Sequence, residues 1–172
     1  MRVDFLGTRR RAPADRESAA GADDHRALRL WLRLLTCTQL IERTVRRQLR
    51  GRFATTLPRF DLMSQLQRHP DGLKMNELSR RMMVTSGNVT GIVDQLVRER
   101  LVERAEDADR RAYRIRLTRT GMRAFGEMAR AHEAWIVQVL GGLTARESTS
   151  LLALLARVKR SCSDVMEKGD AI

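Results

Sequence analysis

The spacing of apolar residues predicts a chain built mainly from helices. Between residue 25 and about residue 52, two apolar stripes run along one segment, the second covering only its N-terminal half. A helix that is apolar on two sides needs two packing surfaces, so we expect one to face its own domain and the other a second copy of the chain. The first stripe contains Leu30, Leu34, Cys37, Ile41, Val45 and Leu49, and the second contains Leu28, Trp31, Leu32 and Leu35.

Three further helices follow from the same periodicity and from end signals. Residues 56–58 (TLP) open one whose inward residues are Leu57, Phe60, Met63 and Leu66, and the turn sequence HPDG at residues 69–72 ends it. Thr118 is expected to cap a long helix to about Leu140, and Thr144 with Glu147 forms a capping box for the last one. Their apolar faces contain Met122, Phe125, Met128, His132, Trp135, Ile136 and Val139 in the first, and Leu151, Leu154, Leu155, Val158, Cys162 and Val165 in the second.

Residues 75–117 predict a short helix, a turn, a second helix and a two-stranded hairpin. The second helix has Thr85 as an N-cap and an apolar face of Val89, Ile92, Val93 and Leu96. Two glycines there lower helix propensity by about 1 kcal/mol each, which close approach to another surface would explain. A plain amphipathic surface helix would show the same apolar face. The opposite side is small or polar, as base reading in a major groove requires: Ser86, Gly87, Asn88, Thr90, Gly91, Asp94, Gln95 and Arg98.

The hairpin favours DNA binding over a plain surface helix. Residues 101–104 and 113–117 have strand patterns, and residues 114 and 116 place two arginines on one face of the second strand. The tip between them is charged, and an arginine there can enter a minor groove while a neighbouring aspartate holds it. A solvated charged turn is the alternative for the tip alone. A helix-turn-helix followed at once by a basic hairpin predicts a winged helix-turn-helix.

Over roughly residues 28–165 the chain resembles the MarR-type transcriptional regulators. The resemblance implies a DNA-binding domain at 56–118, a helical dimerisation region at 25–55 and 119–172, and an acid-x-Arg wing motif at Asp109 and Arg111. It is carried by residues 77–81 (ELSRR), 84–90 (VTSGNVT), 101–104 (LVER), 109–111 (DRR) and 117–121 (LTRTG). The DNA-binding residues expected from pattern and resemblance together are Thr85, Ser86, Gly87, Asn88, Thr90, Gly91, Arg98, Asp109, Arg110 and Arg111.

The expected partners are double-stranded DNA and a second copy of the chain. The terminal helices have no globular domain of their own to cover them, so a two-fold dimer is expected. Its two reading helices would meet half-sites of a pseudo-palindromic operator about 34 Å, or roughly ten base pairs, apart. Residues 1–24 offer little to bury and predict a flexible arm.

Composition supports a polyanionic partner. The formal charge is +12 and the pI about 11.3, but only three of the 33 basic residues are lysines, so where the arginines lie matters more than their number. Cys37 and Cys162 are expected to be small buried hydrophobes in a reducing cytosol, with a redox-sensing thiol as the alternative. Neither a membrane span nor a secretory signal is evident, so we expect a cytoplasmic protein.

No catalytic set, metal site or cofactor is predicted. The three histidines, His25, His69 and His132, lack metal-ligand spacing, and the glycine pair at 141–142 lacks the lysine of a phosphate loop. We therefore expect a non-enzyme. A sequence-indifferent architectural DNA-binding protein and a thiol sensor acting through Cys37 are the competing functions.

A closer resemblance implies an effector. Residues 28–35, 55–63, 87–91 and 132–135 look like the branch that senses hydroxycinnamoyl-CoA thioesters and represses genes for phenylpropanoid breakdown. The family places a pocket among the long helices, here lined by Trp31, Leu35, Phe60, Met63, His132 and Trp135; each could equally be core. A thioester such as feruloyl-CoA or p-coumaroyl-CoA has an aromatic end and several phosphates, for which the expected partners are Arg26, Arg29 and Arg33.

Overall fold

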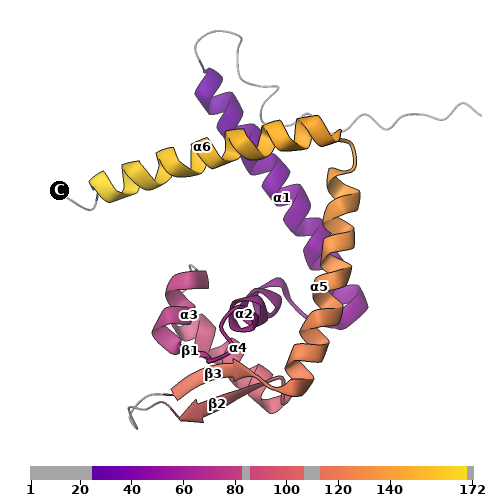
Figure 1. Ribbon diagram of the computed structural model, residues 1–172, viewed down its shortest axis with the longest axis vertical. Helices are drawn as coiled ribbons and strands as arrows, with labels where there is room; N and C mark the ends of the chain where they lie inside the picture. Colours follow the sequence, from indigo (N-terminus) through magenta and orange to yellow (C-terminus); the bar gives the residue numbers. More distant parts are fainter. Residues whose placement is uncertain (1–24, 83–85, 107–112, 170–172) are drawn as a thin grey trace, which may run out of the picture.

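The computed structural model describes residues 25–82, 86–106 and 113–169. The expected arm at residues 1–24 lies outside this part. The predicted mainly helical fold with a small hairpin is confirmed (Figure 1). Its elements are α1 (Arg26–Phe53), α2 (Leu57–Gln67), β1 (Leu73–Lys74), α3 (Met75–Met82), α4 (Ser86–Arg98), β2 (Val102–Glu106), β3 (Tyr113–Leu117), α5 (Arg119–Leu140) and α6 (Ala145–Gly169).

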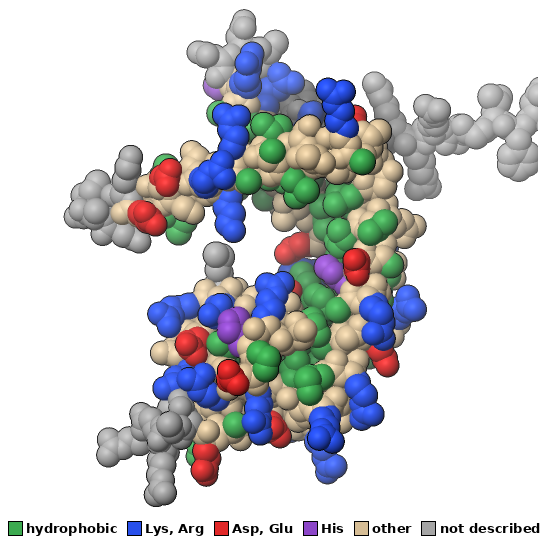
Figure 2. Space-filling view, in the orientation of Figure 1, with side chains coloured by type: hydrophobic (Ala, Val, Ile, Leu, Met, Phe, Trp, Pro, Cys, Tyr) green, Lys and Arg blue, Asp and Glu red, His purple; other side chains and the backbone are tan. Residues whose placement is uncertain are grey.

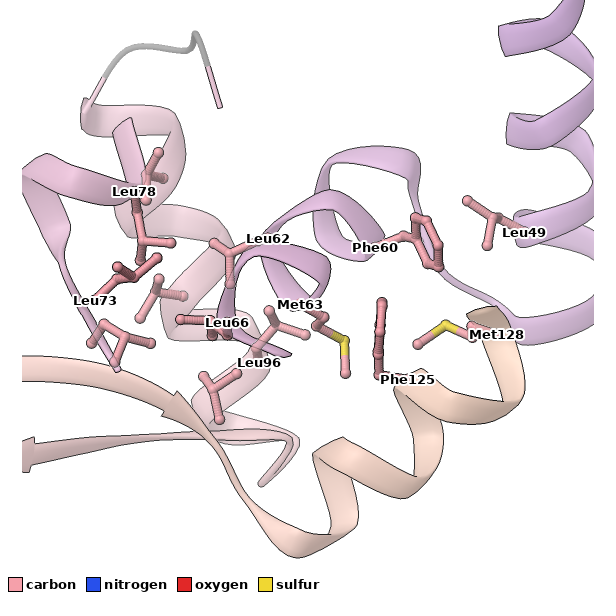
Figure 3. Close-up of a cluster of buried hydrophobic side chains, with 14 of the residues drawn as sticks. Leu49, Phe60, Leu62, Met63, Leu66, Leu73, Leu78, Leu96, Phe125 and Met128 are labelled. Carbon is pink, nitrogen blue, oxygen red and sulfur yellow. The ribbon is translucent and has the colours of Figure 1, made fainter. Parts of the chain in front are cut away.

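A lobe formed by α2, α3, α4 and the sheet holds most of the core. Figure 3 shows leucines from these elements pointing toward one another, with Leu62 and Leu66 of α2 facing Leu78 of α3 and Leu96 of α4. The apolar face predicted for α4 is confirmed, since Val89, Val93 and Leu96 are fully buried and Ile92 is half-buried. A fully buried leucine stabilises the fold by about 1.5–3 kcal/mol, so this lobe is the most strongly stabilised part of the chain.

The sheet is antiparallel with strand order β1-β3-β2. The two hairpin strands pair from Val102↔Leu117 to Glu106↔Tyr113, while Leu73 of β1 pairs with Ile115. The first hairpin strand begins and ends later than the expected 101–104. Strand β1 was not predicted, because two residues are too few for an alternating pattern and only the distant partner β3 defines them as a strand.

The helices α1 and α5 rise from this lobe, and α6 lies across α1 at the far end (Figure 1). Val45 and Leu49 on the C-terminal half of α1 are buried, and Phe53 stacks against Trp135 of α5 at 6.2 Å between ring centroids. The caps predicted at Thr118 and Thr144 are confirmed: Thr118 Oγ1 accepts from the Gly121 N–H at 2.9 Å, and the Thr144 N–H donates to Glu147 Oε2 at 2.8 Å.

Several apolar residues are exposed where the sequence pattern predicted burial. None of the side chains described along α6 is buried, and both Cys37 and Cys162 are exposed, so the interpretation of the two thiols as buried hydrophobes is wrong for the single chain. The reason is that the lobe of the same chain does not reach α6 or the N-terminal half of α1. Met122 and Val139 of α5 are also exposed. Across the described helices, none combines the length and apolar character required to cross a membrane.

Candidate nucleic-acid interface

One face of the helix α4 is polar and exposed to solvent. Asn88, Thr90, Gly91, Gln95 and Arg98 are exposed on it, while the opposite face is buried in the lobe. In the described part of the chain, a Cβ on Gly91 would meet no atom within 4 Å, so packing inside the protein does not require glycine there. The helix begins at Ser86 and includes Gly87, whereas the expected N-cap Thr85 lies outside the described residues.

An ion pair joins α4 to the hairpin. Arg104 of β2 donates to Asp94 of α4 at 2.5 Å, and both side chains are nearly half exposed. A second pair, Arg116 to Glu103 at 2.6 Å, links the two hairpin strands. Exposed pairs of this kind contribute about 0–1 kcal/mol to folding, so the main effect of the Arg104–Asp94 pair is to orient the hairpin against α4. Neither Asp94 nor Arg104 was predicted as a site residue, because their contact depends on how the hairpin folds back.

A groove runs between α4 and the hairpin. It has a volume of about 510 Å³ and is lined by polar and apolar residues together: Lys74, Met75, Asn76, Thr90, Arg104, Tyr113 and Ile115. The tip that continues this hairpin, with the expected residues Asp109, Arg110 and Arg111, lies outside the described residues. Figure 2 shows basic side chains spread around the lobe with acidic ones between them, rather than gathered into one patch.

The start of α3 is fixed from the groove side. The Lys74 N–H donates to Glu77 Oε2 at 2.8 Å, and this bond lowers the pKa of the Glu77 carboxyl, with smaller contributions from Arg114, Arg81 and Arg80. The Arg114 side chain donates to the Gly72 carbonyl at 3.0 Å. Since Gly72 has a φ of 82°, the turn before β1 requires a residue without a Cβ. These contacts hold α3 against the sheet, so that α4 has a firm base.

Four of the expected effector residues come together between α2 and α5. Phe60, Met63 and Trp135 are buried and His132 is half-buried. The Phe60 ring lies 4.9 Å from His132 and 5.4 Å from Phe125 between centroids, and His132 lies 6.5 Å from Trp135. We call Phe60, Phe125, His132 and Trp135 the aromatic wall; Figure 3 shows Phe60 and Phe125 facing each other within it. Three of its members are also core residues.

The other expected effector residues lie elsewhere on α1. Trp31 is 57% exposed, Arg26, Arg29 and Arg33 are exposed, and Leu35 is half-buried. Trp31 precedes Val45, where α1 meets the core, by about 21 Å along the helix axis at 1.5 Å per residue. In the single chain, the expected effector set is therefore divided into an aromatic group at the lobe and a basic group near the start of α1.

Charged residues beside the aromatic wall were not predicted. Burial raises the pKa of the Asp61 carboxyl on α2, an effect opposed by Arg46 of α1 and by His132, while Glu42 adds to it. Asp61 is exposed as a whole residue, and we attribute the raised pKa to water withdrawn from its carboxyl by the helices packed around α2. Arg46 also donates to Glu42 at 3.5 Å. The arginines at 43, 46, 47 and 50 are apparent from the sequence, but the residues that they face in the folded chain are not. Among the described residues, no cluster of His, Cys, Asp and Glu is arranged to hold a metal ion.

The three-helix lobe, the hairpin packed beside it and the bare face of α4 define a winged-helix DNA-binding transcription regulator. The chain belongs to the MarR family, whose sequence model matches residues 55–112. A MarR family transcriptional regulator from Silicibacter pomeroyi is 31% identical in sequence, with a TM-score of 0.70, over 83% of this chain and 99% of that one. That relative is a transcriptional regulator, in agreement with the expected non-enzymatic role.

Two further similarities extend the comparison. The transcriptional activatory protein BadR of Rhodopseudomonas palustris is 27% identical over 146 residues, 83% of each chain. The apo form of MarR from Escherichia coli has a TM-score of 0.67 and 23% identity, over 75% of this chain and 96% of that one. At that identity the second similarity supports the fold alone.

Proposed function

We propose that this protein is a dimeric, ligand-responsive regulator that reads an operator through α4 and leaves it when an aromatic acyl-CoA binds. The DNA-reading part is supported by the division of α4 into a buried apolar face and a solvent-exposed face of Asn88, Thr90 and Gly91. Donors and acceptors on such a face can pair with base edges in a major groove. A sequence-indifferent architectural protein would use backbone contacts alone, so operator and scrambled duplexes at one salt concentration separate the two functions.

The dimer is supported by apolar surface that the chain itself leaves uncovered. Leu30 and Leu34 of α1 and Leu154, Leu155 and Val158 of α6 line one apolar hollow of about 540 Å³. Contiguous exposed surface of this kind marks an association site in a water-soluble protein. We propose that the same helices of a second copy cover it, which places two copies of α4 on one face of the DNA.

The wing assignment rests on the hairpin observed up to the two ends of its tip. We propose that Arg111 enters the minor groove and that Asp109 holds its guanidinium. Arg111→Ala is expected to weaken DNA binding while the dimer persists in light scattering. Affinity unchanged from wild type would contradict this role.

The proposed effector site is the aromatic wall together with the charged groups beside it. Phe60, His132 and Trp135 suit a flat aromatic acyl group, and Arg46 provides a cation near Asp61. Arg26, Arg29 and Arg33 remain the proposed phosphate partners. Because three wall residues are core residues, an occupant must displace side chains, and this displacement gives it different affinities for the two states of the protein.

Calorimetric titration with p-coumaroyl-CoA and feruloyl-CoA tests the effector. We expect at least one to bind at micromolar concentration and to release operator DNA. Absence of both effects would refute the acyl-CoA assignment and leave DNA reading untouched. A reporter driven by the operator decides the sign of regulation, for which we propose repression.

A thiol sensor is the second candidate, because Cys37 is exposed rather than buried. A thiol needs solvent access to react with an oxidant. That function would make peroxide release the DNA and would make Cys37→Ser unresponsive. The acyl-CoA function expects Cys37→Ser to respond to p-coumaroyl-CoA as wild type does.

A further inference from the structure

The first turn of α2 sends three consecutive side chains to three different parts of the molecule. Arg59 forms an ion pair with Glu99, which follows the last residue of α4. Phe60 packs on His132 and Phe125 of α5 in the aromatic wall. Asp61 lies within electrostatic reach of Arg46 of α1 and His132. One helical turn therefore touches both the proposed effector site and the end of the DNA-reading helix.

Glu99 occupies a position that local structure does not favour. The end of α4 is closed by backbone bonds, with the Glu99 N–H donating to the Gln95 carbonyl at 3.1 Å and the Leu101 N–H donating to the Leu96 carbonyl at 2.9 Å. The C-terminal end of a helix carries partial negative charge, so an acid there is unfavourable by itself. Arg59 supplies the cation that compensates it across 40 residues of sequence.

Arg59 is poorly anchored apart from this pair. Its side chain is only 13% exposed, yet its Nε is buried without a hydrogen-bond partner in the part of the chain that the structure describes. Buried donors are normally paired, so the Arg59 Nε departs from the usual pattern. Arg59 also lines a hollow of about 370 Å³ together with Phe53, Met63 and Met128, which gives the side chain room to move.

A second ion pair joins α4 to the hairpin. Asp94 is bound by Arg104 of the hairpin, so α4 is held to the wing at Asp94 and to α2 at the residue that follows its C-terminus. If the Arg59–Glu99 pair opens, the C-terminal end of α4 can shift while Asp94 stays joined to the wing. Such a movement alters how the exposed face of α4 meets base edges.

We propose that Arg59 is a positioning residue: by holding Glu99 it fixes the C-terminal end of α4, and it transmits movement of Phe60 to the DNA-reading face. The second half of this proposal rests on the proposed effector function. An occupant that displaces Phe60 also moves its neighbour Arg59, because both belong to the same turn. The Arg59–Glu99 pair then breaks and the operator affinity falls.

The experiment uses full-length Arg59→Gln, Glu99→Gln and the double variant. Fluorescence anisotropy gives the affinity for an operator fragment, selected beforehand from random duplexes, with and without p-coumaroyl-CoA. Calorimetry gives the affinity for p-coumaroyl-CoA itself. The matched control is Glu127→Gln, which removes an exposed acid that lines the same hollow from α5.

Without p-coumaroyl-CoA, each single variant is expected to lose roughly fivefold or more in operator affinity, and the double variant no more than either, as for residues that act as a pair. With it, the three variants are expected to keep p-coumaroyl-CoA affinity but to lose most of the operator release that wild type shows. The reversed pair Arg59→Glu with Glu99→Arg is expected to restore affinity. The Glu127→Gln control is expected to keep the operator affinity and the release of wild type.

Additive losses, or wild-type operator affinity in all three variants, would overturn the proposal. So would full release of operator by the variants. If wild type fails to bind p-coumaroyl-CoA, the effector assignment is wrong, and the measurements on DNA alone still decide whether Arg59 positions α4. If Arg59→Gln does not fold, Glu99→Gln breaks the same pair from the other side and carries the comparison with wild type.

Discussion

At the scale of single residues, two glycines show opposite reasons for lacking a side chain. A Cβ on Gly121 would lie 1.8 Å from the Leu101 carbonyl oxygen, so α5 can pack against the end of the α4–β2 loop only with glycine there. A Cβ on Gly91 would meet nothing within 4 Å in the described structure. The fold requires glycine at position 121, whereas no contact within the described residues requires it at position 91.

Gly121→Ala is expected to destabilise the protein by about 2–4 kcal/mol, because the clash is with backbone that cannot rotate away. Urea denaturation measures the change. Gly126→Ala on the same helix is the control, since its Cβ would meet only the end of Arg130 at 3.8 Å. Equal stabilities for the two variants would contradict the close approach.

Gly91→Ala is expected to raise stability by up to about 1 kcal/mol through helix propensity while weakening operator binding. The loss follows if the backbone of α4 lies against a base pair. Gly51→Ala in α1 is the control, because its Cβ also meets open space. We expect Gly51→Ala to melt higher with unchanged affinity; a Gly91→Ala protein that binds as wild type does would place α4 away from the groove.

At the scale of elements, the sequence predicts features formed by neighbouring residues but not contacts between residues far apart in the chain. The caps at Thr118 and Thr144 and the apolar face of α4 involve residues within a few positions of each other, so the sequence pattern predicted them. β1 exists only through its pairing with β3, and Arg59 meets Glu99 only after folding. The expected grouping of Trp31 with Phe60 failed in the single chain, because sequence similarity to a family does not show how far apart two residues lie along α1.

The cap of α6 has a pH dependence. The Thr144 N–H and hydroxyl both donate to Glu147, and these bonds lower the pKa of its carboxyl below the usual 4.5. The stabilisation is therefore present above pH 4.5 and is lost as pH falls through the lowered pKa. We expect the melting temperature of wild type to fall relative to Glu147→Gln on going from about pH 7 to about pH 3. A constant difference between the two proteins would contradict the cap.

At the scale of the whole molecule, the lobe buries its apolar side chains, whereas the helices beyond it leave many of theirs exposed. Much of the apolar surface of α6 and of the first half of α1 stays exposed in one chain, and the sequence pattern had already assigned a second packing surface to α1. What the pattern could not show is that even the exposed cysteines belong to this uncovered region.

Leu154→Glu is expected to convert the protein to monomers, because it places a charge in the hollow between α1 and α6. Sedimentation velocity measures the mass, and operator affinity is expected to fall with it, since one α4 reads only half a site. Met122→Glu is the control, a similarly exposed apolar residue at the lobe end of α5. A Leu154→Glu protein that remains dimeric would place the interface elsewhere.

The most direct test of the account is selection of bound sequences from a pool of random duplexes by the full-length protein at fixed salt. We expect a single enriched site with two-fold symmetry whose half-site centres lie about ten base pairs apart. Recovery of unrelated sequences, or of an unpaired half-site, would contradict a paired reading of DNA by α4.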